Sequence, residues 1–210
     1  MKHLESNNIL YDLQHGFRSS RSCETQLTSF IQELAKNNND KIQTDVIVMD
    51  FAKAFDKDPH KRLLYKLKYY GADTNILNWI EDFLTLRTQT VILDGEKSEK
   101  IHLTSGVPQG TVLGPILFFV CINAFHEYIK HSTLRLFADD SILYKTIIDE
   151  SDAHKLQEDL DQQQNGKMTG LCNSILTNAQ SCTYQLRRTL YITNTYSINV
   201  LSKLNLQQNT

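Results

Sequence analysis

Cysteine is scarce in this sequence and is never clustered. The 210 residues include four cysteines, none of which forms a C-x-x-C pair: Cys23, Cys121, Cys172 and Cys182. This spacing excludes a zinc site or a disulfide framework that could be recognised from sequence. We therefore expect reduced thiols and a cytoplasmic or nuclear setting.

Long apolar segments are also missing. The first five residues, Met1 to Glu5, do not form the apolar centre of a signal peptide, so we expect that the protein is not secreted. The longest apolar stretch, residues 112–125, is interrupted by Gly114 and Pro115 and is too short to cross a bilayer. We expect no interaction with a membrane.

Positive charge is not in excess either. The formal net charge is -2 and the sequence pI is about 6.4, whereas a free-standing nucleic-acid-binding domain is usually basic. Bulk charge therefore argues mildly against that class. The length of 210 residues and the hydrophobic content of 40% are typical of one folded domain with a real core.

Apolar spacing and turn signals predict a mixture of helices and antiparallel strands, which is an α+β fold. The apolar, β-branched run Val46–Met49 predicts a strand buried on both faces. The other predicted elements are helices that begin near Ser22, Pro59, Thr74 and Ser151, a buried helix from Pro115 to Tyr128, and hairpins at Asp94-Gly95 and Ala138–Asp140. Beyond Gln162 only two weak strands, near 182–186 and 190–196, are suggested.

Acidic residues stand at the ends of two apolar strands. Asp50 follows the strand at 46–49, and Asp139 and Asp140 occupy the tip of the second hairpin. An ionised carboxylate beside a buried strand is costly without a partner, and Mg²⁺ is a partner that prefers oxygen ligands. Two such ions can activate a 3′-hydroxyl and stabilise a leaving pyrophosphate. By spacing alone, ordinary turn roles for these aspartates remain open.

Four ordered motifs make the chain resemble one family. Phe137–Asp140 reads FADD, and Asp50–Asp56 is similar to the motif DFxKAFD. Ser105–Pro115 is similar to SGVPQGSVLGP, and Gln14–Arg18 is similar to QxGFR. In their order along the chain, the motifs resemble the reverse transcriptase domain of non-LTR, LINE-type retrotransposons. The resemblance extends over roughly residues 7–165.

The resemblance implies a fold and a reaction. The fold would be a right-hand polymerase palm, with the strands of Asp50 and of the Asp139-Asp140 hairpin side by side and helices over one face. The reaction would copy an RNA template into DNA from a DNA primer and dNTPs, with two Mg²⁺ ions or Mn²⁺ in their place. Carried over by position, Asp50, Asp139 and Asp140 are the catalytic carboxylates and metal ligands. The backbone carbonyl of Phe51 is a further metal ligand.

Other positions carry implied contacts. Phe55 would be the aromatic gate that excludes a 2′-hydroxyl, and Gln109 and Gly110 would contact the nucleotide. Gly106 and Gly110 would allow a backbone approach that a Cβ blocks. For Phe55 the alternative is a plain core aromatic, and for the glycines it is simple turn chemistry.

Two arginines near the N-terminus are candidates for nucleic-acid binding. Arg18 and Arg21 could contact backbone phosphates, which are the commonest targets of arginine in nucleic-acid complexes. A solvated surface role is the alternative for both residues.

The resemblance is incomplete at both ends of the chain. We expect residues 1–21 to be a remnant of a fingers region, 22–165 to be the palm, and 166–210 to be a degenerate C-terminal segment. In this interpretation the fingers are incomplete and the thumb is missing.

Four residues depart from the family pattern. Gly166 and Gly170 stand where family members usually have tryptophan, and Ser181 replaces the lysine of an NxxKC motif. Asp58 stands where the family usually has valine before Pro-His. These departures place the activity of this chain in doubt more than its ancestry.

Two hypotheses of different classes follow. One is an RNA-directed DNA polymerase, and the other is a catalytically inactive, transposon-derived palm fragment with at most weak nucleic-acid or metal binding. A small metal-dependent hydrolase is disfavoured because it would not explain the Pro-Gln-Gly loop at 108–110. Nothing in the sequence indicates an oligomeric state.

Overall fold

The computed structural model describes residues 1–51 and 55–164, apart from the side chains of residues 50, 163 and 164. Mixed helix and sheet confirms the predicted fold class. The helices are α1 (Lys2–Ser6), α2 (Cys23–Asn39), α3 (His60–Tyr69), α4 (Thr74–Leu84), α5 (Leu113–Ile122), the 3-10 helix η1 (Asn123–Tyr128) and α6 (Glu150–Gln164). The strands are β1 (Gln43–Asp50), β2 (Thr88–Gln89), β3 (Ile92–Leu93), β4 (Glu96–Lys97), β5 (Ile101–His102), β6 (Thr133–Phe137) and β7 (Asp140–Ile147).

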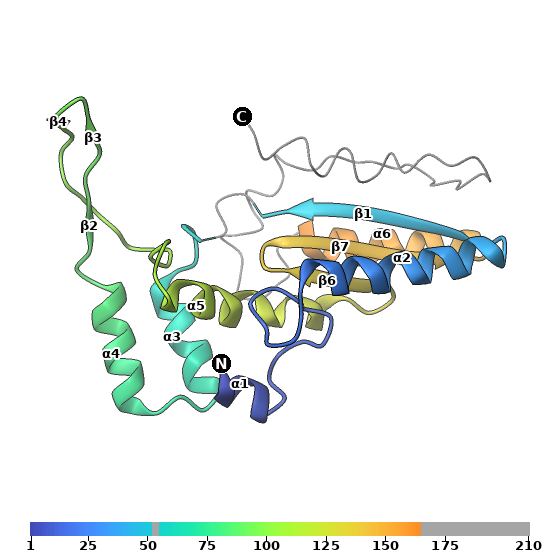
Figure 1. Ribbon diagram of the computed structural model, residues 1–210, viewed down its shortest axis with the longest axis horizontal. Helices are drawn as coiled ribbons and strands as arrows, with labels where there is room; N and C mark the ends of the chain where they lie inside the picture. The colour runs from blue at the N-terminus through green and yellow to red at the C-terminus, as the bar shows by residue number, and fades with distance from the viewer. Residues whose placement is uncertain (52–54, 165–210) are drawn as a thin grey trace.

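The main sheet has three antiparallel strands in the order β1-β7-β6 (Figure 1). The register runs from Gln43 opposite Ile147 to Asp50 opposite Asp140 along β1 and β7. β6 and β7 form the second predicted hairpin. The prediction that the strand of Asp50 lies beside the strand of Asp140 is therefore confirmed.

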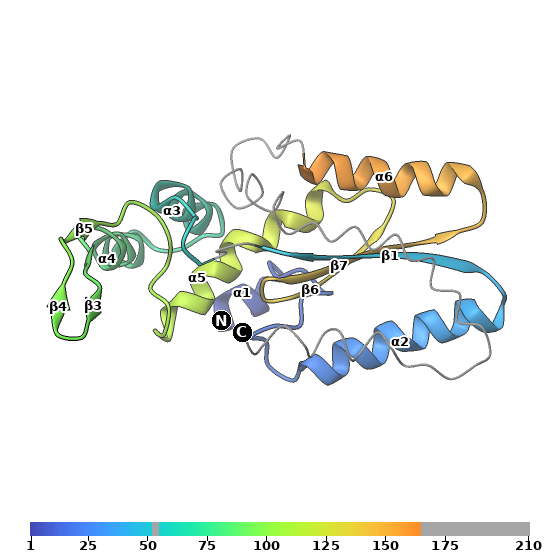
Figure 2. The ribbon, with the colours of Figure 1, turned by 90° about the horizontal axis from the view of Figure 1, so that it is seen from above.

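Helices flank the sheet on both faces, so the prediction of one covered face is wrong. Figure 2 shows α6 on one side of the sheet and α2 on the other. Leu156 and Leu160 of α6 join the hydrophobic core together with Leu134, Leu136 and Leu143 of the sheet. Helix α2 packs against the opposite face of the sheet, and its Asn37 contacts the end that holds Gln43.

The contact of α2 with the sheet is partly polar. Phe30 packs edge-on against Tyr144, with ring centroids 5.1 Å apart. Asn37 donates to the hydroxyl oxygens of Thr44 at 2.9 Å and of Thr146 at 3.1 Å. The contacts of Asn37 lie toward the Gln43 end of β1.

The strand β1 is therefore less buried than its apolar sequence predicts. Val48 is 43% exposed, and Val46, Ile47 and Met49 are only partly buried. Among the described residues β1 pairs only with β7, so it forms an edge of the sheet. An edge strand has a sheet neighbour on one side only, so its apolar residues can stay partly exposed.

A second group of elements lies beyond one end of α5. Helices α3 and α4 pack against each other, and the small strands β2 to β5 extend from α4 as an arm (Figure 1). The predicted turn at Asp94-Gly95 is confirmed because it joins β3 to β4. Helix α4 begins at Thr74, as predicted, and is capped by Asp73, whose carboxylate accepts from Asn75 N at 2.8 Å.

The core is built around α5. Leu117, Phe118, Phe119 and Phe125 are almost fully buried there. The predicted helix at 115–128 changes at Asn123 into the 3-10 turn η1. Within the described part of the chain, no helix is long and apolar enough to cross a membrane. The weak strands predicted near 182–186 and 190–196, and Gly166, Gly170 and Ser181, lie outside the described residues.

Candidate active site

The three aspartates predicted to be catalytic occupy neighbouring positions at one end of the main sheet. Asp50 is the last residue of β1 and lies directly opposite Asp140, the first residue of β7. Asp139 precedes Asp140 in the turn that joins β6 to β7. The side chain of Asp139 is partly buried, and that of Asp140 is exposed. Residues directly opposite each other in an antiparallel pair share one face of the sheet.

The turn that carries Asp139 has an unusual backbone. Phe137 pairs with Asp140, so only Ala138 and Asp139 make the turn. Ala138 has a φ of +54° and is buried. This left-handed region is unfavourable for a residue with a Cβ, so neighbouring groups must hold the turn in place.

The donor chemistry at this end of the sheet fits Mg²⁺. Among the described side chains, no group of three or more histidine, cysteine, aspartate or glutamate residues could hold a metal ion. The side chain of Asp50 is not among the described ones. The register nevertheless places three carboxylate-bearing positions together, and Phe51 follows Asp50 directly. Carboxylate and backbone carbonyl oxygens are the hard ligands that Mg²⁺ prefers.

A glutamine that motif reasoning left without a role contacts the turn. Gln14 has no exposed surface. Its Oε1 accepts from Ala138 N at 3.1 Å, and its Nε2 donates to Ala138 O at 3.3 Å. The signal in the sequence was its place at the start of the Gln14–Arg18 motif, which indicates importance without indicating a partner.

The loop before α5 is bound to the segment after Asp50. Val107 N donates to Phe55 O at 2.7 Å, and Gly106 N donates to Asp58 O at 2.8 Å. Ser105 Oγ donates to the carbonyl of Asp56 at 2.9 Å. The two motifs, which are distant in sequence, thus form one framework beside the Asp50 end of the sheet.

Gly106 makes this framework possible. A Cβ at Gly106 would lie 2.7 Å from the backbone of Asp56, and its φ is +80°. The expected close approach is confirmed here. Gly110 also has a φ of +80°, but no described heavy atom lies within 4 Å of a Cβ built there.

Substitution of Gly106 by alanine should destabilise the fold. We expect a loss of roughly 2–4 kcal/mol in the free energy of unfolding, from left-handed strain plus a backbone clash. Gly95→Ala is the matched control because Gly95 has a φ of +88° with nothing within 4 Å. Urea unfolding measures both losses. Equal losses for the two variants would show that the contact with Asp56 carries no energy.

The predicted nucleotide contacts surround this framework. Phe55 is partly buried and stacks on Phe118, with ring centroids 4.4 Å apart and an interplanar angle of 25°. The Phe51 side chain is buried and packs edge-on against Phe125 at 5.0 Å. Gln109 is exposed. The ring of Phe55 thus packs on the core while the residue remains partly accessible.

The two candidate arginines lie in the N-terminal segment. Arg18 donates to the carbonyl of Tyr11 at 3.0 Å, and Arg21 contacts the carbonyl and the carboxylate of Asp12. Burial, followed by the charge of Arg21, lowers the pKa of Arg18. The two cations are thus neighbours, and both are partly exposed.

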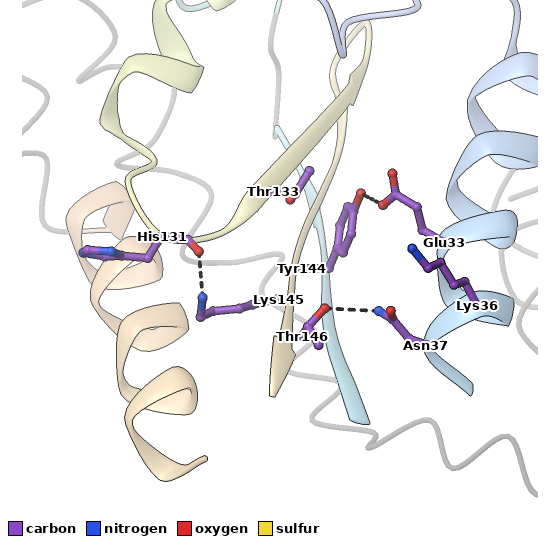
Figure 3. A pocket seen from close by; sticks show the side chains of 8 residues that line it. All are labelled: Glu33, Lys36, Asn37, His131, Thr133, Tyr144, Lys145 and Thr146. Carbon is purple, nitrogen blue, oxygen red and sulfur yellow. Dashed lines mark hydrogen bonds between the residues drawn. The ribbon is translucent and has the colours of Figure 1, made fainter. Parts of the chain in front are cut away.

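A polar cavity of about 330 Å³ lies at the other end of the sheet, between α2 and the start of β6 (Figure 3). Its lining groups bond to one another: Tyr144 donates to Glu33, and Lys145 donates to the carbonyl of His131 at 2.9 Å. Glu33 also pairs with Arg135 at 2.7 Å. The polar groups around the cavity therefore bond α2 to the sheet.

Comparison with known proteins agrees with this geometry. Residues 1–171 match the protein family described as reverse transcriptase (RNA-dependent DNA polymerase). The chain belongs to this family. The sequence resemblance to non-LTR retrotransposon enzymes is thereby confirmed, because the relatives found include such elements.

The relatives are much longer proteins. The chain is 31% identical over 169 residues to a probable RNA-directed DNA polymerase from transposon BS of Drosophila melanogaster, covering 74% of this chain and 18% of that protein. It is 32% identical over 167 residues to the RNA-directed DNA polymerase from mobile element jockey of Drosophila funebris, covering 75% and 18%. This reverse transcriptase chain therefore spans less than a fifth of the length of these curated relatives.

Solved structures agree at the level of fold. Telomerase from Candida tropicalis has a TM-score of 0.53 at 14% identity, covering 79% of this chain and 36% of that one. Telomerase from Candida albicans has a TM-score of 0.52 at 12% identity, covering 76% and 31%. The mixed helix and sheet of this chain matches a polymerase palm, as predicted.

Proposed function

We propose that this chain is the palm of an RNA-directed DNA polymerase, which extends a DNA primer with dNTPs on an RNA template. The observation that supports it most is the register that sets Asp50 opposite Asp140, with Asp139 in the adjoining turn. A nucleotidyl transferase needs carboxylates that converge from neighbouring strands. Here two sequence-distant motifs supply them at one end of one sheet.

Each residue has a proposed role. Asp50, Asp139 and Asp140, with the Phe51 carbonyl, would hold two Mg²⁺ ions, which supply activation of the primer hydroxyl and charge stabilisation at the leaving phosphate when bound. The carboxylates also fix where the triphosphate sits, because their negative charge excludes phosphate from positions that no cation neutralises. The exposed Asp140 and partly exposed Asp139 are open to solvent and hence to substrate.

The incoming nucleotide would lie against Phe55, Gln109 and Gly110. The core contact with Phe118 fixes the ring plane of Phe55, so the ring can act as a rigid wall against the sugar. The open backbone at Gly110 would admit a base or phosphate. Arg18 and Arg21 would contact phosphates of template or primer, and each would then exchange a backbone carbonyl partner for a phosphate.

Primer extension tests the proposal. The chain, with an RNA template, a labelled DNA primer and dNTPs, should extend the primer with Mg²⁺ or Mn²⁺ and stop when the metal is chelated. The Asp139→Asn variant is the inactive reference. If a folded chain extends no primer, the proposal fails and the inactive palm fragment is the conclusion. The template and primer would place an active enzyme in the nucleus or cytoplasm.

Replacement of Phe55 by valine should relax sugar selection. The smaller side chain leaves room for a 2′-hydroxyl, so we expect the preference for dNTP over rNTP to fall roughly tenfold or more. The ratio of kcat/KM values for dCTP and CTP measures it. Phe83→Val is the control, because Phe83 stacks on Trp79 within α4, which lies away from the main sheet (Figure 1). An unchanged ratio would leave Phe55 as a core aromatic.

A further inference from the structure

The buried side-chain amide of Gln14 forms hydrogen bonds with both the backbone N–H and the backbone carbonyl of Ala138. Its Oε1 accepts from Ala138 N at 3.1 Å and from Gly16 N at 2.9 Å, and its Nε2 donates to Ala138 O at 3.3 Å. Both polar groups of the side chain are thus used. An apolar side chain of the same size at position 14 could not replace these bonds, because the Ala138 amide would remain buried without a partner.

The backbone around Gln14 fixes this amide in place. His15 N donates to Leu136 O at 2.9 Å, and Leu136 N donates to Leu13 O at 3.0 Å. Gln14 thereby forms a parallel bridge with Leu136 of β6. The segment is a short backbone ladder along β6 that ends at the turn.

Gly16 packs its backbone directly against the backbone of the turn. A Cβ at Gly16 would lie 2.3 Å from Ala138 N, so no other residue fits without movement of the turn. Ala138 itself has the unfavourable φ of +54°. The conformation of Ala138 is therefore held by its surroundings and not by its own backbone preference.

We propose that Gln14 is a positioning residue that sets the turn of Ala138 and thereby aims Asp139 at the metal site. The inference rests on the proposed function only for the role of Asp139; that Gln14 holds the turn is independent of it. Groups that orient a metal ligand from behind usually change metal affinity when they are removed. Gln14 would act through Asp139 and would not touch substrate.

Hydrogen exchange tests the bond between Gln14 and the Ala138 amide directly, and it does not require enzyme activity. The Ala138 amide is at the tip of a hairpin, where exchange is normally fast, yet the bond to Gln14 should protect it. In Gln14→Met we expect its protection to fall roughly tenfold or more, while amides in α6 keep theirs. If the wild-type Ala138 amide exchanges as fast as an exposed amide, the proposal is overturned without any variant.

Direct Mn²⁺ binding, followed by electron paramagnetic resonance, tests the consequence. We expect Gln14→Met to weaken Mn²⁺ binding by about tenfold. Gln26→Met is the matched control, because Gln26 is also buried and makes no described side-chain bond to the turn. It should leave Mn²⁺ binding and Ala138 exchange within about twofold of wild type. Gln14→Glu keeps the acceptor for both amides and should restore most of the protection.

The outcomes separate the two proposals. Unchanged Mn²⁺ binding in Gln14→Met, in a wild-type background that binds Mn²⁺ and extends primers, refutes positioning and leaves the proposed function standing. A wild-type chain that protects Ala138 but neither binds Mn²⁺ nor extends primers refutes the proposed function, and with it the role of Gln14 toward a metal. Equal losses in Gln14→Met and Gln26→Met would indicate general destabilisation and would also refute it.

Discussion

Replacing Asp139 by asparagine is expected to reduce Mg²⁺-dependent primer extension by roughly a thousandfold or more, equivalent to about 4 kcal/mol in transition-state free energy. The substitution keeps the size and shape of the side chain but removes one negative charge. An amide is a poor ligand for Mg²⁺, and the cation-binding charge at the turn would fall from two carboxylates to one. Asp139 lies in the turn next to Asp140, which pairs with Asp50 in the sheet.

The fold should tolerate this change. Asp139 is partly exposed and lies in a turn, so removal of its charge does not disturb the core. Circular dichroism and urea unfolding should match the wild-type protein. Mn²⁺ binding should weaken in parallel with activity, because the proposed defect is loss of a ligand.

Asp45→Asn is the control for Asp139→Asn. Asp45 lies on the same strand as Asp50, five positions earlier, and accepts from Gln43 Nε2 at 2.8 Å. It should keep full primer extension. If Asp139→Asn were as active as Asp45→Asn, Asp139 would not be a metal ligand, and the assignment of the active site would have to move.

The sequence was sufficient to predict the strands that carry the three aspartates because its signals for them are local. An apolar run ending in an aspartate and a hairpin with two aspartates at its tip each specify a short strand. The pairing of those strands is long-range, and the motif order supplied it through resemblance. The register then confirmed it, with Asp50 opposite Asp140.

Contacts that depend on three-dimensional packing could not be predicted in this way. Gln14 is polar and near the N-terminus, where composition predicts exposure, yet it is fully buried against the turn of β6 and β7. The side that α2 covers was also missed. Amphipathic spacing shows that a helix has an apolar face, but it does not show which side of the sheet receives it.

Asp58 is the residue whose sequence departure has the clearest physical cost. It is only 2% exposed and stands where the family usually has valine. Cys121 Sγ donates to one carboxyl oxygen, whereas the other has no partner among the described residues. Burial raises the pKa of Asp58 to about 7, against the opposing effect of the charges on Lys66 and Arg62.

This pKa should make stability depend on pH with a definite sign. Between the unfolded value of 3.8 and the folded value of about 7, the folded chain keeps a proton on Asp58 that the unfolded chain releases. The contribution of this group to stability is therefore largest below pH 4 and is lost as the pH rises to 7. Each pKa unit corresponds to about 1.4 kcal/mol, so the loss should approach roughly 4 kcal/mol.

Asp58→Asn should remove this loss. The amide keeps a similar shape and an acceptor for Cys121, but it does not ionise. The difference in unfolding free energy between Asp58→Asn and wild type should therefore rise in favour of the variant by about 3–4 kcal/mol from pH 4 to pH 7.5. Urea unfolding at a series of pH values measures it, and comparison with wild type cancels the titration of other groups.

Asp159→Asn should change stability in the opposite direction at neutral pH. Asp159 is also fully buried, but its two carboxyl oxygens accept from Lys130 N at 3.0 Å and His131 N at 2.9 Å. An asparagine NH₂ cannot accept from a backbone amide, so roughly 1–3 kcal/mol should be lost. The same substitution would thus stabilise the fold at Asp58 and destabilise it at Asp159.

If the difference between Asp58→Asn and wild type stayed constant from pH 4 to pH 7.5, the Asp58 carboxyl would not be desolvated as the fold requires.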